Sequence, residues 1–125
     1  MNNAYICVRI QNTNTMIQLD KDFNKSGIGE SIDAEFMPTI NYTRIQSYQG
    51  EMYFTPTKVY LMPHYEEAAM LFHPQCFTYD EVVSYKRKLL AGYEIVLKDG
   101  TKVLLSNVFG KMRAGITQAF DEHKK

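Results

Sequence analysis

Hydrophobic and polar residues alternate most clearly in the last third of the chain. Segment 93–105 reads as two half-buried strands joined at Asp99-Gly100, and segment 77–85 leads into it. A three-residue loop at 98–100 with Gly100 left-handed would pair Leu97 with Thr101 and place the hairpin's apolar side chains on one face. These side chains are Tyr93, Ile95, Leu97, Val103 and Leu105. A two-residue loop would scatter them, so we predict the three-residue loop.

After this hairpin the periodicity changes to that of an amphipathic helix. Asn107 is a suitable N-cap, and apolar residues then recur at three- and four-residue spacing. They are Phe109, Met112, Ile116, and Ala119 or Phe120. Gly110 and Gly115 weaken a helix, so we expect them to permit close approach to a sheet or another helix. A single apolar stripe needs a sheet to cover, which predicts a mainly β fold with one C-terminal helix.

The remaining pattern predicts further strands and a single domain over residues 1–125. Strands are expected at 5–10, 16–19, 40–48, 52–54, 59–62 and 82–88. Residues 55–58 predict a turn, 20–33 a charged loop with room for a short helix, and 66–72 fits a helix or a strand equally well. We expect residues 1–35 to be an N-terminal extension or an extra hairpin, 40–106 the β core and 107–122 the helix.

Three segments carry a family resemblance. Residues 50–61 look like a "G-x-L-Y-x-T-x-x-R-x-x-F" segment with Lys58 in the basic position, and 77–85 is similar to "I-P-Y-x-D-I-x-x-V". Residues 92–105, followed by Phe109 and Arg113, resemble a closing hairpin, its Phe and a terminal helix. In this order they resemble the pleckstrin-homology (PH) superfold, most closely its GRAM-like and bacterial PH-like branch, over about residues 48–122. Residues 1–35 do not fit the family pattern.

The resemblance implies an antiparallel β-barrel or sandwich of about seven strands, capped by one C-terminal α-helix. It also implies a binding module, which recognises phosphoinositides or other lipids in some members and mediates protein binding or self-association in others. Fold alone does not choose between these functions.

Charge gives one candidate site. Fourteen basic residues balance fourteen acidic ones, so no net field attracts the chain to nucleic acid or an anionic membrane. Lys86-Arg87-Lys88 is the one dense basic run, and with Lys58 it could clamp an anionic headgroup. The alternative is a solvated strand end whose charges discourage edge pairing, and the zero net charge favours that alternative.

The pattern offers little for catalysis or metal binding. Of His64, His73 and Cys76 only the last two are closely spaced, so we predict no metal site, no cofactor and no enzyme activity. Cys76 is expected to be a buried structural thiol. Cys7 and Cys76 form no disulfide framework, and the sequence shows neither a signal-like start nor an apolar run long enough to span a bilayer. We therefore expect a cytoplasmic protein.

These observations favour a non-catalytic module for protein binding or self-association, with an exposed strand edge as a route through β-augmentation. The alternative is a peripheral module that binds anionic lipid through Lys86, Arg87 and Lys88 and weakens with salt. Nucleic-acid binding is a remote third class, because basic residues and aromatics are hardly interleaved. The tyrosines of the predicted strands fit the core and an interface equally well.

Overall fold

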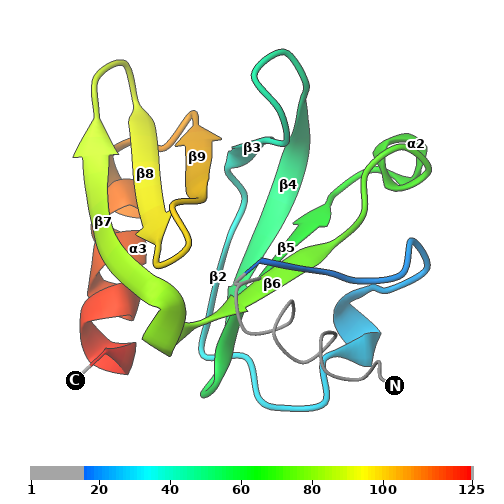
Figure 1. The fold of residues 1–125 in the computed structure, drawn as a ribbon, viewed down its shortest axis with the longest axis horizontal. Coiled ribbons are helices and arrows are strands. Elements are labelled where there is room, and N and C mark those ends of the chain that lie inside the picture. The colour runs from blue at the N-terminus through cyan, green and yellow to red at the C-terminus, as the bar shows by residue number, and fades with distance from the viewer. Residues whose placement is uncertain (1–15, 125) are drawn as a thin grey trace, which may run out of the picture.

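A strongly bent antiparallel sheet with one long helix against it forms the protein (Figure 1). The computed structural model describes residues 16–124, so the predicted strand at 5–10 and Cys7 lie outside the described residues. The described chain contains nine strands in the order β1-β6-β5-β4-β3-β9-β8-β7, with β2 paired to β4 as well. The strands are β1 (Ile17–Gln18), β2 (Ala34–Phe36), β3 (Thr39–Asn41), β4 (Ser47–Phe54), β5 (Lys58–Pro63), β6 (Gln75–Thr78), β7 (Val82–Lys88), β8 (Gly92–Leu97) and β9 (Lys102–Ser106). The helices are α2 (Glu66–Ala69) and α3 (Gly110–His123), with 3-10 turns at Lys25–Gly27 and Tyr79–Glu81.

β2 and β3 are two halves of one interrupted strand along the same edge of β4. β2 pairs with the second half of β4, and β3 pairs with its first half. Between them Pro38 has no N–H to donate, and its carbonyl accepts from the Gly50 N–H at 2.9 Å. On its other side β3 pairs with β9. The interruption therefore lets the chain pass from one half of the bent sheet to the other.

The core fills the space between the two halves of the sheet and α3. Its largest fully buried side chains are aromatic, among them Tyr93, Phe54, Phe77 and Phe120. α3 contacts both β2 and β7 and so covers the open side. Phe120 meets Phe54 edge-on at 5.0 Å between ring centroids and stacks on Tyr85 at 4.8 Å. A mainly β fold closed by one C-terminal helix is confirmed.

The predicted register of the closing hairpin is also confirmed. Ile95 pairs with Val103, the Leu97 N–H donates to the Thr101 carbonyl at 2.9 Å, and Gly100 has a φ of 92°. All five side chains of the predicted apolar face are buried.

The predicted strand at 40–48 is wrong. A turn separates β3 from β4, and within it the Thr43 hydroxyl accepts the N–H groups of Ile45 and Gln46 at 3.3 and 3.0 Å. β4 then runs straight through Gly50, where we expected the strand to end. A Cβ at Gly50 would lie 2.1 Å from Ile40 Cδ1, so the glycine makes room for that core side chain.

The predicted start of the C-terminal helix is wrong as well. Asn107 has a φ of 59° and donates its side-chain amide to Thr39 Oγ1 at 2.8 Å, so it caps nothing. Phe109 is the N-cap instead and is 64% exposed, outside the buried stripe. Close approach is confirmed for Gly115, whose Cβ would lie 2.6 Å from the Phe36 ring, but Gly110 has open space and a φ of 27°.

The segments left open or loosely defined are now assigned. The short strand expected at 16–19 appears as β1, which pairs with β6. The 20–33 loop contains the 3-10 turn at Lys25–Gly27, and the ambiguous segment 66–72 holds α2. Most tyrosines of the predicted strands lie in the core, namely Tyr48, Tyr53, Tyr60 and Tyr93 on strands and Tyr79 on the 3-10 turn before β7.

Candidate functional site

One end of the molecule, which we call the loop end, collects the turns at 42–46, 64–74, 89–91 and 107–109. The β3–β4 and β7–β8 hairpins project from it in the same direction (Figure 1). The segment after β5 leaves from the same end, because the His64 N–H donates to the Gln49 carbonyl near the start of β4. It also reaches back to the β3–β4 hairpin, where Phe72 packs on Tyr42 and Tyr48 with centroid distances of 5.0 and 4.9 Å.

The β7–β8 hairpin has an unusual tip. The Gly92 N–H donates to the Leu89 carbonyl at 3.2 Å, and between them Leu90 and Ala91 have φ values of 58° and 60°. Two successive left-handed residues mark a type I′ turn, which Asn-Gly normally occupies, and a left-handed L-residue costs about 1 kcal/mol. The Ala91 carbonyl accepts the Val108 N–H at 2.8 Å, which ties the tip to the loop before α3.

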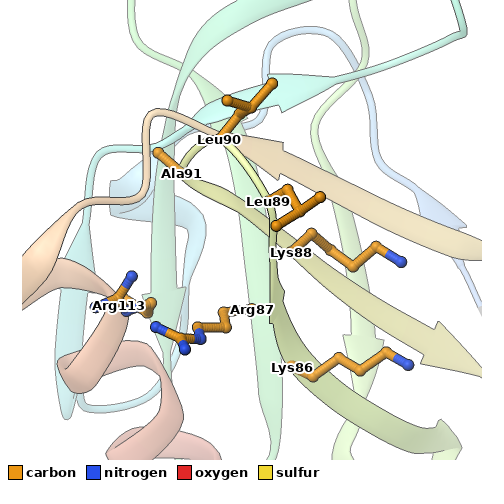
Figure 2. A pocket seen from close by; sticks show the side chains of 7 residues that line it. All are labelled: Lys86, Arg87, Lys88, Leu89, Leu90, Ala91 and Arg113. Atoms are coloured by element: carbon orange, nitrogen blue, oxygen red, sulfur yellow. The ribbon is translucent and has the colours of Figure 1, made fainter.

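Four cationic side chains surround this tip. We call the shallow hollow lined by Lys86, Arg87, Lys88, Arg113 and the tip residues 89–91 the basic hollow. Figure 2 shows the head groups of Arg87 on β7 and Arg113 on α3 pointing toward one another. Lys86 and Lys88 extend from the opposite face of β7, as strand alternation requires.

Two carboxylates lie nearby. Lys88 Nζ is 4.0 Å from Glu94 Oε1, and Asp121 lines the adjoining hollow with Lys86, Arg87 and Arg113. The Asp121 carboxylate accepts the Tyr85 hydroxyl at 2.5 Å, and this bond raises the pKa of Tyr85 to about 12, assisted by burial. Four positive charges against two negative ones leave a local excess of positive charge in a chain whose net charge is zero.

The structure brings three of the four predicted site residues together and leaves out the fourth. Lys58 pairs with Thr78, close to where β7 begins at Val82. β7 then runs away for seven residues, so Lys88 lies about 20 Å along the strand from that point. Arg113 takes the place that we gave to Lys58. Its helical spacing placed it outside the apolar stripe, but nothing in the sequence indicated that α3 would bring it beside Arg87.

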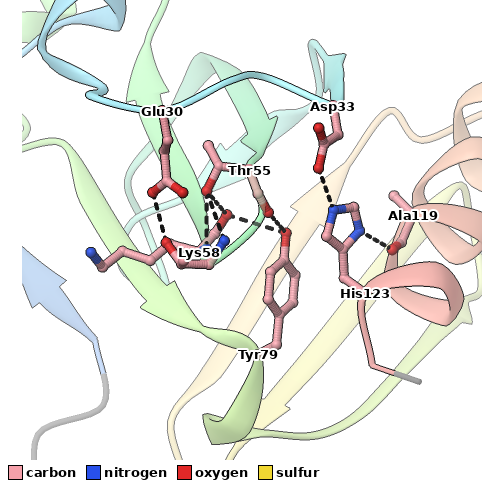
Figure 3. Close-up of polar contacts among 8 residues, drawn as sticks. Glu30, Asp33, Thr55, Lys58, Tyr79, Ala119 and His123 are labelled. Atoms are coloured by element: carbon pink, nitrogen blue, oxygen red, sulfur yellow. Dashed lines mark hydrogen bonds and ion pairs between the residues drawn. The ribbon is translucent and has the colours of Figure 1, made fainter.

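A second polar cluster lies at the opposite end of the sheet (Figure 3). The Tyr79 hydroxyl donates to the Thr55 carbonyl at 2.6 Å, and the His123 ring bridges the Asp33 carboxylate and the Ala119 carbonyl. Burial raises the pKa of Tyr79. These groups satisfy one another and fasten the end of α3 to the sheet, so we assign the cluster a structural role.

The residues weighed for metal or thiol chemistry are dispersed. His64 Nδ1 pairs with Glu51 at 2.7 Å, while His73 bonds the Leu19 carbonyl at 3.1 Å. Within residues 16–124 no group of three His, Cys, Asp or Glu side chains could hold a metal ion. Cys76 is buried as predicted, and burial raises the pKa of its thiol, which makes it a poor nucleophile.

No helix in the described part of the chain is long and apolar enough to cross a membrane.

Comparison by sequence finds nothing: no protein-family model and no curated protein matches the chain. Solved structures do match its fold. The C-terminal domain of an unknown protein from Leishmania infantum aligns with a TM-score of 0.62 and 16% identity, covering 77% of this chain and 85% of that one. The N-terminal PH domain of human ARAP2 aligns with a TM-score of 0.58 and 8% identity over 82% and 86%. The linker-DH/PH domains of p115-RhoGEF align with a TM-score of 0.62 and 8% identity over 77% and 29%.

The fold is PH-like. This confirms the predicted superfold, and at such low identities the likeness establishes the fold alone. The chain spans less than a third of the p115-RhoGEF chain that it matches.

Proposed function

We propose that the chain is a non-catalytic PH-like interaction module of the GRAM-like kind, whose basic hollow binds anionic phospholipid headgroups at the cytoplasmic surface of a membrane. The observation that carries this is the convergence of Arg87 and Arg113 from different elements. Neither guanidinium forms an ion pair with any residue in 16–124. Two unpaired guanidiniums that face each other repel, and a phosphate between them would relieve the repulsion with charge-assisted hydrogen bonds.

The geometry supports headgroup binding better than protein binding by β-augmentation. β7 is an end of the sheet, but it has a register shift between Val82 and Ser84, and its last three residues are cationic. Bulges and edge charges both oppose the addition of another strand. The other end of the sheet is β1, which has two residues, and the remaining edge is β2, which has three residues and lies against α3. Nucleic-acid binding has less support, because Tyr85, the aromatic beside the basic run, already stacks on Phe120.

Co-sedimentation with vesicles tests this function. The chain should bind phosphatidylcholine vesicles that contain about 30% phosphatidylserine, lose affinity as salt rises and ignore pure phosphatidylcholine. Arg87→Ala/Arg113→Ala should bind about thirtyfold more weakly, since each cation near an anionic surface contributes about 1 kcal/mol.

Lys98→Ala/Lys102→Ala is the matched control, because it removes the same charge around the distant β8–β9 turn. It should bind within about threefold of the unmodified chain. Equal losses in the two variants would contradict a specific site. A failure to bind vesicles, combined with a mass that rises with concentration, would favour self-association instead.

A further inference from the structure

We infer that the β7–β8 hairpin tip inserts into the acyl boundary of an anionic bilayer, so that Leu89 and Leu90 are buried in lipid while the basic hollow contacts the headgroups. This inference rests on the proposed function and adds an orientation and a hydrophobic anchor to it.

The first support is the exposure of the tip. Leu89 is 90% exposed and Leu90 98% exposed, although they are adjacent and stand at the apex of a hairpin. A single exposed leucine is ordinary on a protein surface. Two at the apex of one hairpin form the kind of apolar projection that a bilayer can receive without any rearrangement of the sheet.

The second support is the backbone. Leu90 and Ala91 hold left-handed conformations in a two-residue turn where Asn and Gly are the residues that fit. Folding alone gives no reason to place a leucine there, because it is strained and fully hydrated in the free protein. Strain retained at an exposed site is typical of functional positions.

The third support is the distribution of charge around the loop end, which indicates the side that faces the bilayer. The β3–β4 turn carries Ile45, 92% exposed, beside Arg44. With β9 between β8 and β3, the two hairpins stand roughly 14 Å apart along the sheet, assuming the usual strand spacing. The long Lys and Arg side chains of both hairpins can reach the headgroups while the apolar tips lie deeper in the bilayer.

The α2 side of the loop end has the opposite character. Met70 and Leu71 are exposed by 73% and 72%, so their exposure alone resembles that of the tip leucines. They follow Glu66 and Glu67, both exposed, and an anionic surface repels these carboxylates. We therefore place the hairpins against the bilayer and α2 away from it. This also provides a matched control pair of apolar residues.

A tryptophan reporter tests the depth of insertion. The chain contains no tryptophan, so Leu90→Trp supplies a single fluorophore at the tip and Met70→Trp one beside α2. On addition of the phosphatidylserine vesicles, the emission of Leu90→Trp should shift to the blue and be quenched by lipids brominated on the acyl chain. The emission of Met70→Trp should stay that of a hydrated indole.

Affinity tests the contribution of the leucines. Leu89→Ser/Leu90→Ser should bind the same vesicles at least tenfold more weakly with an unchanged salt dependence, since apolar area and not charge is lost. Met70→Ser/Leu71→Ser should bind within about twofold of the unmodified chain. Leu90→Asn/Ala91→Gly should raise the urea midpoint of unfolding and still weaken binding, which separates loss of insertion from loss of folding.

The outcomes distinguish the two proposals. If the unmodified chain does not bind anionic vesicles, both proposals are overturned. If it binds but the Leu90→Trp emission does not move and the double serine variant binds normally, insertion is overturned and headgroup binding stands. If the serine variant instead abolishes a concentration-dependent mass and leaves vesicle binding intact, the tip is a protein contact and insertion is again overturned.

Discussion

Protonation of His123 should stabilise the fold, because the ring meets two hydrogen-bond acceptors at once. Nδ1 lies 2.7 Å from the Ala119 carbonyl, and Nε2 lies 2.7 Å from Asp33 Oδ2. A neutral imidazole carries one N–H, so only the imidazolium can donate to both acceptors. The ring also stacks on Tyr79 at 4.8 Å between centroids. The charged form therefore holds the last turn of α3 against the segment that leads into β2 (Figure 3).

The sign of the pH dependence follows from the pKa of His123. Burial lowers this pKa, but the hydrogen bonds to Asp33 and Ala119 outweigh burial, and the pKa is raised above its ordinary 6.5. A group whose pKa is raised by folding contributes its full stabilisation at pH values below its pKa in the unfolded chain. The stabilisation is lost as pH rises through its pKa in the folded protein. A charged hydrogen bond contributes about 1.5–3 kcal/mol, and because the Asp33 side chain is 40% exposed we discount this to about 1 kcal/mol.

Urea unfolding of the unmodified chain and Asp33→Asn measures this contribution. Asparagine keeps an acceptor oxygen and removes the charge. At about pH 5.5 the variant should unfold with about 1 kcal/mol less free energy, or about 0.7 M less urea for a slope near 1.5 kcal/mol/M. As pH rises through the folded pKa of His123 toward about pH 8.5, the difference should shrink, because the imidazole loses its proton and with it the charged hydrogen bond to Asp33.

Asp121→Asn serves as the control, since its partner Tyr85 does not titrate in this range and the cost should be the same at both pH values. An Asp33→Asn penalty of equal size at the two pH values would refute the charged pair.

Two further substitutions probe the core. Gly50→Ala should destabilise the fold by about 1–3 kcal/mol, because the new Cβ would lie 2.1 Å from Ile40 Cδ1. Gly29→Ala is the control, since its Cβ would meet nothing within 4 Å and the change should be nearly neutral. The urea midpoints of unfolding of the two variants measure the difference. Tyr48→Phe should stabilise the fold by about 1 kcal/mol, because the buried Tyr48 hydroxyl has no hydrogen-bond partner among residues 16–124, and a loss of stability in the same assay would mean that the hydroxyl is satisfied.

Local pattern predicted the elements whose neighbours are close in sequence. The β8–β9 register followed from alternation and one glycine, since a slip of one residue would have exposed the whole apolar face. The 40–48 strand failed because its strand-forming residues hide a turn that the Thr43 hydroxyl stabilises. The role of Gly50 also depends on a distant residue, since Ile40 packs over it across the β3–β4 pair. Contacts between distant segments produce no periodic pattern in the sequence, so they could not be predicted from it.

The candidate site could be predicted from the sequence only in part, again because only its neighbouring residues form a pattern. Lys86, Arg87 and Lys88 are adjacent, so the run was evident, but Arg113 joins them only because α3 crosses beside β7. Lys58 was chosen from a family pattern, and the direction of β7 separates it from the others. Leu89 and Leu90 also carried a signal in the sequence. They lie between the basic run and Gly92, where a hairpin turn normally contains Gly, Asn or Asp, so two leucines at that position are unusual.

The two ends of the sheet differ in whether their polar and apolar groups find partners within the protein. At one end Tyr79, His123 and the Lys124 ammonium, which donates to the Tyr79 and Val82 carbonyls, find partners within the chain. At the loop end the guanidiniums face each other, and the tip leucines are hydrated and partly strained. Selection for folding alone would remove such features, because a polar tip with Asn-Gly in the turn is more stable. Their concentration on one hairpin is therefore best explained by an anionic, partly apolar partner that offsets the cost when it binds.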